Sequence, residues 1–232
     1  MQTCLLLRGA TAGSVLIDCG ASALIAMRRA GVDPASVEWV VLSHLHGDHF
    51  AGLPFMILDG QFRRRLRPLR IAGPPGVAER VRAAMEVLFP GSSTASRRFP
   101  VEFVELADRT PTPLGPTVIT AVEVIHPSGA PAYALRLHYG GKTVAYSGDT
   151  EWTEALVEVA TGADLFVCEA YFFDKPVKYH LDFHTLVGNR RRLGCRRLVV
   201  THMSEDMLAR GPGLDVEVAE DLKVIRLGVE VE

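Results

Sequence analysis

The chain has 232 residues, of which 48% are hydrophobic and 22% are charged, and its formal net charge is −2. This composition is ordinary for a globular protein that is long enough to bury a full core, and we expect one domain spanning residues 1–232. The near-neutral charge excludes the class of proteins that bind polyanions through their overall charge.

The sequence carries no pattern of a membrane-spanning or secreted protein. No apolar run approaches the roughly 20 residues of a membrane span, and the run at residues 5–7 is too short for a signal sequence. The four cysteines stand singly, which indicates buried thiols rather than a disulfide set or a Cys-x-x-Cys metal site. We therefore expect a cytoplasmic protein that makes no membrane contact.

The first part of the chain predicts strands alternating with helices. Asp18 closes the second expected strand. The alternative interpretation of this residue is an N-cap of the helix that follows. The pattern predicts strands at 3–7 and 15–19 around a turn at 9–13, a helix at 21–30, a short helical turn that starts at 33–34, a strand at 39–43, a helix at 53–61, a strand at 69–72 and a helix at 77–88.

Residues 43–49, with the sequence SHLHGDH, directly follow an apolar run at 39–42. They contain three imidazoles and one carboxylate, which are ligands that zinc and similar divalent metals accept. His44 and His46 are two positions apart, so in extended backbone they face the same way and can share one metal. Gly47 lets the chain turn, so that Asp48 and His49 can face a second metal. The alternative interpretation is a solvated loop or a single adventitious metal site.

A dense basic run contains Arg63, Arg64, Arg65, Arg67 and Arg70. A solvated helix end is the favoured interpretation, because charge runs usually lie on solvated surfaces, and a phosphate-binding patch is the alternative.

Three more candidate ligands each follow an apolar strand pattern in the second part of the chain. His126 follows a strand expected at 117–125, Asp149 follows one at 142–146, and His202 follows one at 198–201. The other expected elements are strands at 101–106, 133–138 and 164–169, helices at 153–160 and 214–222, and a closing strand at 223–231.

The ordered set of HxHxDH, histidine, aspartate and histidine resembles the metallo-β-lactamase-fold hydrolases, over about residues 14 to 228. This resemblance implies an α/β fold, a four-layer αββα sandwich (metallo-β-lactamase fold), and two divalent metal ions, zinc or alternatively manganese. It also implies that Asp18 supports the metal loop without being a ligand. The implied ligands are His44, His46 and His126 for one metal, Asp48, His49 and His202 for the other, and Asp149 as a bridge.

A second resemblance concerns the segments around Glu169 and His180. They are similar to ribonuclease Z and its phosphodiesterase relatives, in which a glutamate orients a histidine before a helix and that histidine protonates the leaving oxygen. Glu169 and His180 fill these positions, and His184 is the alternative donor. We favour His180 because the resembled family places a capping polar residue, here Asp182, at the start of the helix, and because the 22 residues from His180 to His202 are near the family's spacing. Asp48, Glu169 and His180 are thus the expected catalytic residues.

The spacing of the ligands bears on the substrate. Only 23 positions separate His126 from Asp149, and a predicted hairpin fills them, so there is no room for the long arm of a transfer-RNA processing nuclease. We therefore expect a small or cyclic phosphodiester as substrate and no structured RNA. The alternatives are a thioester or lactone hydrolase and a non-catalytic, metal-stabilised nucleotide-binding module. A homodimer that covers the sheet edge near the N-terminus is a further expectation.

Overall fold

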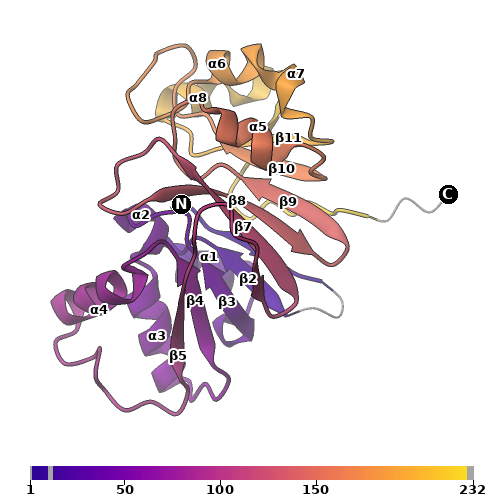
Figure 1. Ribbon diagram of the computed structural model, residues 1–232. Helices are drawn as coiled ribbons and strands as arrows, with labels where there is room; N and C mark the ends of the chain where they lie inside the picture. The colour runs from indigo at the N-terminus through magenta and orange to yellow at the C-terminus, as the bar shows by residue number, and fades with distance from the viewer. Residues whose placement is uncertain (1, 10–12, 229–232) are drawn as a thin grey trace.

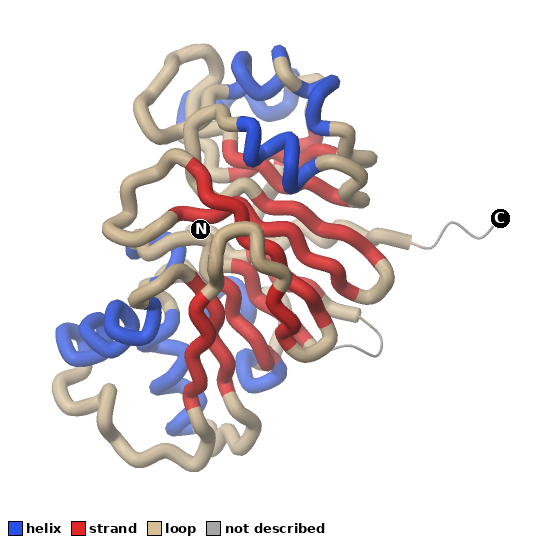
Figure 2. Tube along the Cα trace, viewed as in Figure 1, coloured by secondary structure: helices blue, strands red, loops and turns tan. Residues whose placement is uncertain are grey.

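Two β-sheets face each other and helices cover both outer faces (Figures 1 and 2). The computed structural model describes residues 2–9 and 13–228. In Figure 1 helices α5–α8 lie above the strands of the second sheet, and α3 and α4 lie to the left of the strands of the first sheet. The predicted four-layer αββα sandwich is thereby confirmed.

The first sheet comes from the N-terminal part of the chain. Among the described residues it has the strand order β1-β2-β3-β4-β5, and only the β1–β2 pair is antiparallel. Its strands are β1 (Leu5–Leu7), β2 (Ser14–Ile17), β3 (Val37–Val41), β4 (Leu69–Gly73) and β5 (Val101–Glu105).

The second sheet comes from the rest of the chain, with the described strands in the order β12-β11-β10-β9-β8-β7-β6. Strands β6 to β9 pair antiparallel, whereas β9 to β12 pair parallel, so β7, β9, β10 and β11 all point the same way. The strands are β6 (Thr112–Leu114), β7 (Thr117–Val124), β8 (Ala132–Tyr139), β9 (Lys142–Tyr146), β10 (Leu165–Glu169), β11 (Leu198–Thr201) and β12 (Glu217–Val218).

The helices bury apolar faces on the outer sides of the sheets. The described helices of the first half are α1 (Ala23–Arg29), η1 (Pro34–Ser36), α2 (Gly47–Phe50), α3 (Leu53–Phe62) and α4 (Val77–Leu88). Those of the second half are α5 (Glu154–Ala160), α6 (Phe183–Gly188), α7 (Arg190–Leu193), α8 (Glu205–Arg210) and η2 (Gly211–Gly213). Val77, Val81 and Met85 of α4 are buried, as the helical spacing predicts.

Apolar side chains form one cluster between the sheets and one under each helical layer. Ile17 and Val41 from the first sheet meet Tyr146 and Val167 from the second. A second cluster joins α1, α3 and α4 to the first sheet, and a third joins α5, α6 and α7 to the second. The sheets are thus fixed face to face by a continuous apolar layer, which fixes the relative position of their strand ends.

The structure contradicts two predictions near the C-terminus. The helix expected at 214–222 is wrong, because Glu217 and Val218 pair in parallel with β11 and extend the sheet. The expected closing strand is also wrong, since residues 223–228 have no regular secondary structure, and 229–231 lie outside the described residues. Helix α8 was not predicted, although Ser204 caps it and acidic residues occupy its first turn. The turn expected at 9–13 lies partly outside the described residues.

Arg65 contradicts the interpretation of the basic run as solvated. Its residue is only 5% exposed, whereas Arg63, Arg64 and Arg67 are exposed. The guanidinium donates to the carbonyl oxygens of Val37, at 2.7 Å, and Pro68, at 2.7 Å. Arg65 therefore connects the end of α3 to the starts of β3 and β4 through hydrogen bonds.

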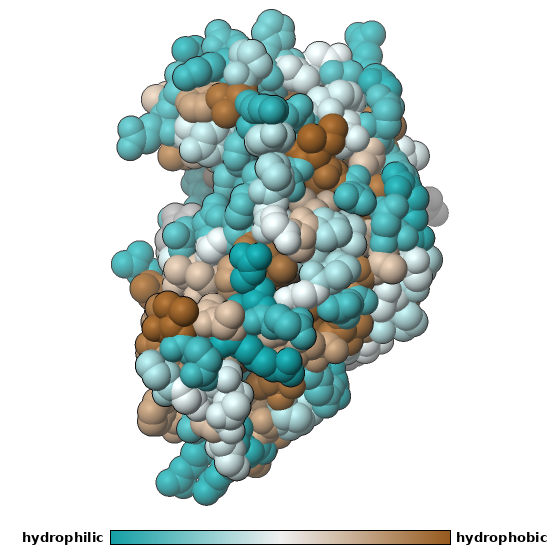
Figure 3. Space-filling model, turned by 60° about the vertical axis from the view of Figure 1, so that its left-hand side comes forward, coloured by the Kyte–Doolittle hydropathy of each residue, from teal (hydrophilic) through white to brown (hydrophobic). Residues whose placement is uncertain are grey.

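The described helices include none that is both long enough and apolar enough to cross a membrane. On the face drawn in Figure 3, hydrophobic side chains form small separate patches among hydrophilic ones.

Candidate metal centre

The candidate ligands all lie where strands end at one edge of the sandwich. His44 and His46 follow β3, His126 follows β7, Asp149 follows β9 and His202 follows β11. Because the sheets are packed face to face, the loop after β3 meets the strand ends of the second sheet. The structure therefore brings together residues that are up to 158 positions apart, from His44 to His202.

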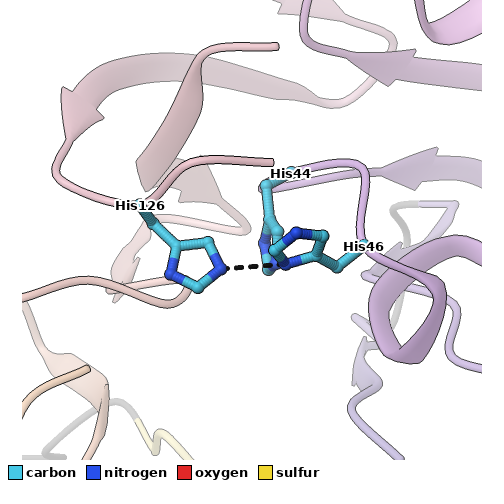
Figure 4. Close-up of side chains that lie close together, drawn as sticks. All are labelled: His44, His46 and His126. Atoms are coloured by element: carbon cyan, nitrogen blue, oxygen red, sulfur yellow. Dashed lines mark hydrogen bonds between the residues drawn. The ribbon is translucent and has the colours of Figure 1, made fainter. Parts of the chain in front are cut away.

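The first cluster consists of His44, His46 and His126, each of which offers one ring nitrogen within 4.8 Å of the others. Figure 4 shows the three rings converging from two loops. Nε2 of His126 lies 2.9 Å from Nδ1 of His46. Two ring nitrogens this close need a proton or a cation between them, because two lone pairs facing each other repel.

The second cluster consists of Asp48, His49, Asp149 and His202. Nε2 of His49 lies 3.3 Å from Oδ1 of Asp149, and Nε2 of His202 lies 3.4 Å from Oδ2 of Asp48. Two ligand atoms on one tetrahedral zinc are about 3.4 Å apart when each bond is about 2.1 Å. The separations in this cluster match that spacing.

Asp149 lies between the two clusters. Its Oδ2 lies 3.8 Å from Nε2 of His44 and 3.5 Å from Nε2 of His202. The carboxylate is therefore within reach of both groups of histidines, as the bridging position requires.

Buried polar atoms without partners show that the site suits cations. Among the described residues, Nε2 of His44, Nε2 of His49 and Oδ1 of Asp149 are buried and lack a hydrogen-bond partner. Leaving such atoms unpaired costs about 1–3 kcal/mol each. Divalent metals would satisfy all three, and a set of imidazoles and carboxylates suits zinc.

Asp18 holds the metal loop, residues 43–49, through hydrogen bonds at both of its ends. Its fully buried carboxylate accepts hydrogen bonds from the backbone N–H of Ser43 at 2.8 Å and from Nδ1 of His49 at 2.7 Å. Its N-cap interpretation is wrong, because Ser22 occupies the N-cap position of α1. With Nδ1 bonded to Asp18, His49 presents Nε2 to the centre.

Two further hydrogen bonds set the tautomers of the first cluster. The Ser43 hydroxyl donates its proton to Asp18 at 2.8 Å. Its oxygen lies 3.0 Å from Nδ1 of His44 and can accept a hydrogen bond from the N–H at that position. Nδ1 of His126 donates to the carbonyl oxygen of Tyr179 at 2.9 Å. Both imidazoles therefore direct the lone pair of Nε2 toward the centre.

The electrostatics divide four of the candidate histidine ligands into two kinds. Burial and the neighbouring His49 lower the pKa of His44 to about 2, and burial also lowers the pKa of His126. Burial opposes charge on His49 and His202 as well, but nearby carboxylates outweigh it and raise the pKa of each. His44 and His126 are therefore kept neutral, as metal ligands must be, whereas His49 and His202 pair with carboxylates.

The predicted dyad is formed. Nδ1 of His180 lies 3.0 Å from Oε2 of Glu169, which is fully buried at the end of β10. Burial and the nearby Asp149 raise the pKa of Glu169 well above its ordinary value, and cations bound alongside would favour its ionised form. The ring centre of His180 lies 5.0 Å from that of His126, so the dyad borders the metal centre.

His184 lies elsewhere. It is exposed on α6, and no described side-chain contact joins it to the site. Asp182 accepts from the backbone N–H of Thr185 at 2.8 Å and caps α6, as predicted. The structure thus places His180, and not the alternative donor His184, beside the candidate ligands.

Sequence reasoning missed the supporting groups. The carbonyl of Tyr179 contacts His126, and the hydroxyl of Ser43 joins Asp18 to His44. Ser43 directly precedes the motif and was recognisable by its position. Tyr179 lies 53 residues from its partner, and a backbone carbonyl carries no sequence signal.

Comparisons with known proteins identify the family. A model of the beta-lactamase superfamily domain matches residues 14–203. The chain is 34% identical over 246 residues to the uncharacterized protein Rv1339 of Mycobacterium tuberculosis (strain ATCC 25618 / H37Rv), a match covering 96% of this chain and 86% of that protein. It is 27% identical to a ribonuclease Z of Agathobacter rectalis, covering 84% of this chain and 80% of that one.

The fold is shared with solved structures. Human tRNase Z, short form (ELAC1), superposes with a TM-score of 0.79 at 21% sequence identity, covering 98% of this chain and 93% of that one. The matched family model covers the metal loop, His126, Asp149 and His202. This chain therefore belongs to the beta-lactamase superfamily, and it has the metallo-β-lactamase fold of that superfamily's hydrolases.

Proposed function

We propose that this protein is a metal-dependent phosphodiesterase with a dinuclear zinc centre that hydrolyses a small or cyclic phosphodiester. The observation that carries the proposal is the dyad of Glu169 and His180 at the edge of the two ligand clusters. A proton donor at this place suits a reaction with a poor leaving oxygen, such as an alkoxide. β-Lactams and thioesters have less need of one.

Each group has a role in the proposed reaction. His44, His46 and His126 would hold one metal, Asp48, His49 and His202 the other, and Asp149 would contact both. Bound zinc supplies a Lewis acid for the phosphoryl oxygen and a water nucleophile at neutral pH. Glu169 holds Nδ1 of His180, so that Nε2 is available to give a proton to the leaving oxygen.

The short connection between His126 and Asp149 supports a small substrate. Strands β8 and β9 fill this connection as a tight hairpin, and no arm extends from it. The net charge of −2 adds no general attraction for a polyanion such as a structured RNA.

Hydrolysis of bis(p-nitrophenyl) phosphate tests the proposal. We expect turnover by the zinc-loaded protein, loss of turnover with a chelator and recovery when zinc is restored. Asp149→Ala should abolish turnover, whereas His138→Ala, at an exposed position on β8, serves as the matched control. A folded protein that binds two metals but cleaves no diester would contradict the proposed activity and favour a binding module.

A further inference from the structure

Tyr171 lies against both the proposed proton donor and a proposed metal ligand. Its ring centre is 4.8 Å from that of His180 and 5.6 Å from that of His202. The two imidazoles are themselves 5.7 Å apart and nearly parallel, with 4° between their planes. All three separations fall in the range at which aromatic rings attract each other.

The backbone of Tyr171 joins the same two segments. Its N–H donates to the carbonyl oxygen of Leu181, next to His180, at 2.8 Å. Its carbonyl oxygen accepts from the N–H of Ser204, two residues after His202, at 2.9 Å. Ring and backbone together therefore tie the His180 segment to the end of β11.

Glu169 and Tyr171 act from one short stretch at the end of β10. They are two positions apart, and in extended backbone such residues share a face. The carboxylate of Glu169 contacts Nδ1 of His180 at 3.0 Å and lies 3.8 Å from Nδ1 of His202. The carboxylate thus holds one edge of the His180 imidazole by a hydrogen bond and lies near His202, and the Tyr171 ring packs against both imidazoles.

We infer that Tyr171 is a positioning residue that holds His180 in the orientation needed to protonate the leaving oxygen, an inference that rests on the proposed phosphodiesterase activity. Glu169 fixes one nitrogen but leaves the imidazole free to tilt about that hydrogen bond. The Tyr171 ring limits this tilting on one face of the His180 imidazole. The ring centre of His126 lies 5.0 Å from that of His180. Small displacements of a reacting group can cost about a hundredfold in rate.

Leaving-group dependence tests the inference. Nitrophenolate leaves without a proton, whereas the sugar alkoxide of a cyclic mononucleotide needs one. In zinc-loaded Tyr171→Leu we expect kcat to fall about tenfold or more for the cyclic mononucleotide and less than about twofold for bis(p-nitrophenyl) phosphate. Tyr171→Phe keeps the ring and should match the wild type on both substrates, with zinc content equal in all variants.

Phe172→Leu is the matched control, because this neighbouring ring contacts Tyr171 but makes no described ring contact with either imidazole. An equal loss on both substrates in Tyr171→Leu, or no loss on either, would overturn the positioning role. Tyr171→Met replaces the leucine variant if the latter does not fold.

A readout without turnover separates this inference from the proposed function. The proton between His180 and Glu169 should appear in an imidazole NMR spectrum and exchange slowly with water. We expect exchange about tenfold faster in Tyr171→Leu and unchanged in Phe172→Leu. Unchanged exchange in Tyr171→Leu would overturn the inference, whereas a wild type that cleaves neither substrate would overturn only the proposed function.

Discussion

His126 donates its Nδ1 proton to the carbonyl oxygen of Tyr179, and Tyr179 is the residue directly before His180. A candidate metal ligand is thereby bonded to the segment that carries the candidate proton donor. The N–H of Tyr179 in turn donates to Glu151 at 2.8 Å, which fixes the segment from its other side. The position of the His180 segment relative to the metal centre is therefore fixed by hydrogen bonds of Tyr179.

We predict that His180→Gln lowers kcat about 10²- to 10⁴-fold on a diester with an alkoxide leaving group, the usual contribution of a general acid. Turnover of bis(p-nitrophenyl) phosphate should fall far less, because nitrophenolate needs no proton. Steady-state kinetics on both substrates give the measurement. His184→Gln is the control, and a larger loss in that variant would assign the proton donor to His184 instead.

Asp18→Asn should weaken zinc binding about 10- to 100-fold, as loss of a hydrogen-bond partner of metal ligands usually does. The substituted amide has only one acceptor oxygen, so it cannot accept both of the hydrogen bonds that Ser43 and His49 now donate to the two carboxylate oxygens. Titration against a competing chelator measures the change. Asp33→Asn, which alters only the cap of η1, should bind zinc as the wild type does.

Removing the Arg65 guanidinium should destabilise the fold by about 2–4 kcal/mol, because buried carbonyl groups lose a charged donor. Urea unfolding of Arg65→Ala gives the value. Arg67→Ala, at an exposed neighbouring position, should change the free energy of unfolding by less than about 0.5 kcal/mol. Similar losses in the two variants would show that Arg65 makes no special contribution.

Acid should weaken the attachment of β12. Hydrogen bonds from Arg197 lower the pKa of Glu217 from 4.5 to about 2. A carboxyl group whose pKa is lowered by folding stabilises the protein above its unfolded pKa, and this stabilisation is lost as the pH falls from 4.5 toward 2. The pair is partly exposed, so we expect at most about 1 kcal/mol.

Chemical unfolding between pH 5 and about pH 3 measures this effect in metal-free protein. Glu217→Gln should have a shallower pH dependence than the wild type in this interval. Glu220→Gln, an exposed carboxylate close by, should retain the wild-type slope. Equal slopes in all three proteins would contradict a role for Glu217.

The parts of the fold that depend on local patterns were predictable. Helix α4 and strand β11 have the expected bounds, because their apolar residues follow a clear periodicity. The candidate ligands were predictable because each directly follows an apolar strand, and the order of residue types is itself specific. Their roles as ligands stay predictions until a metal is bound.

Features that depend on distant contacts were not predictable. Glu217 and Val218 lie in a segment with helical spacing, yet the free edge of β11 recruits them as a strand. Arg65 resembles its exposed neighbours in sequence, and only the surrounding carbonyl groups distinguish it. In both cases a hydrogen-bonding demand elsewhere in the molecule outweighs the local pattern.

The seven candidate ligands are divided between the two sheets. His44, His46, Asp48 and His49 lie in the segment that follows β3 of the first sheet, and the other three follow strands of the second sheet. Neither half of the chain can complete either cluster by itself, since each cluster takes members from both. A bound cation would accordingly crosslink the two halves of the sandwich. Its retention would indicate that the two sheets are packed in their native relative position.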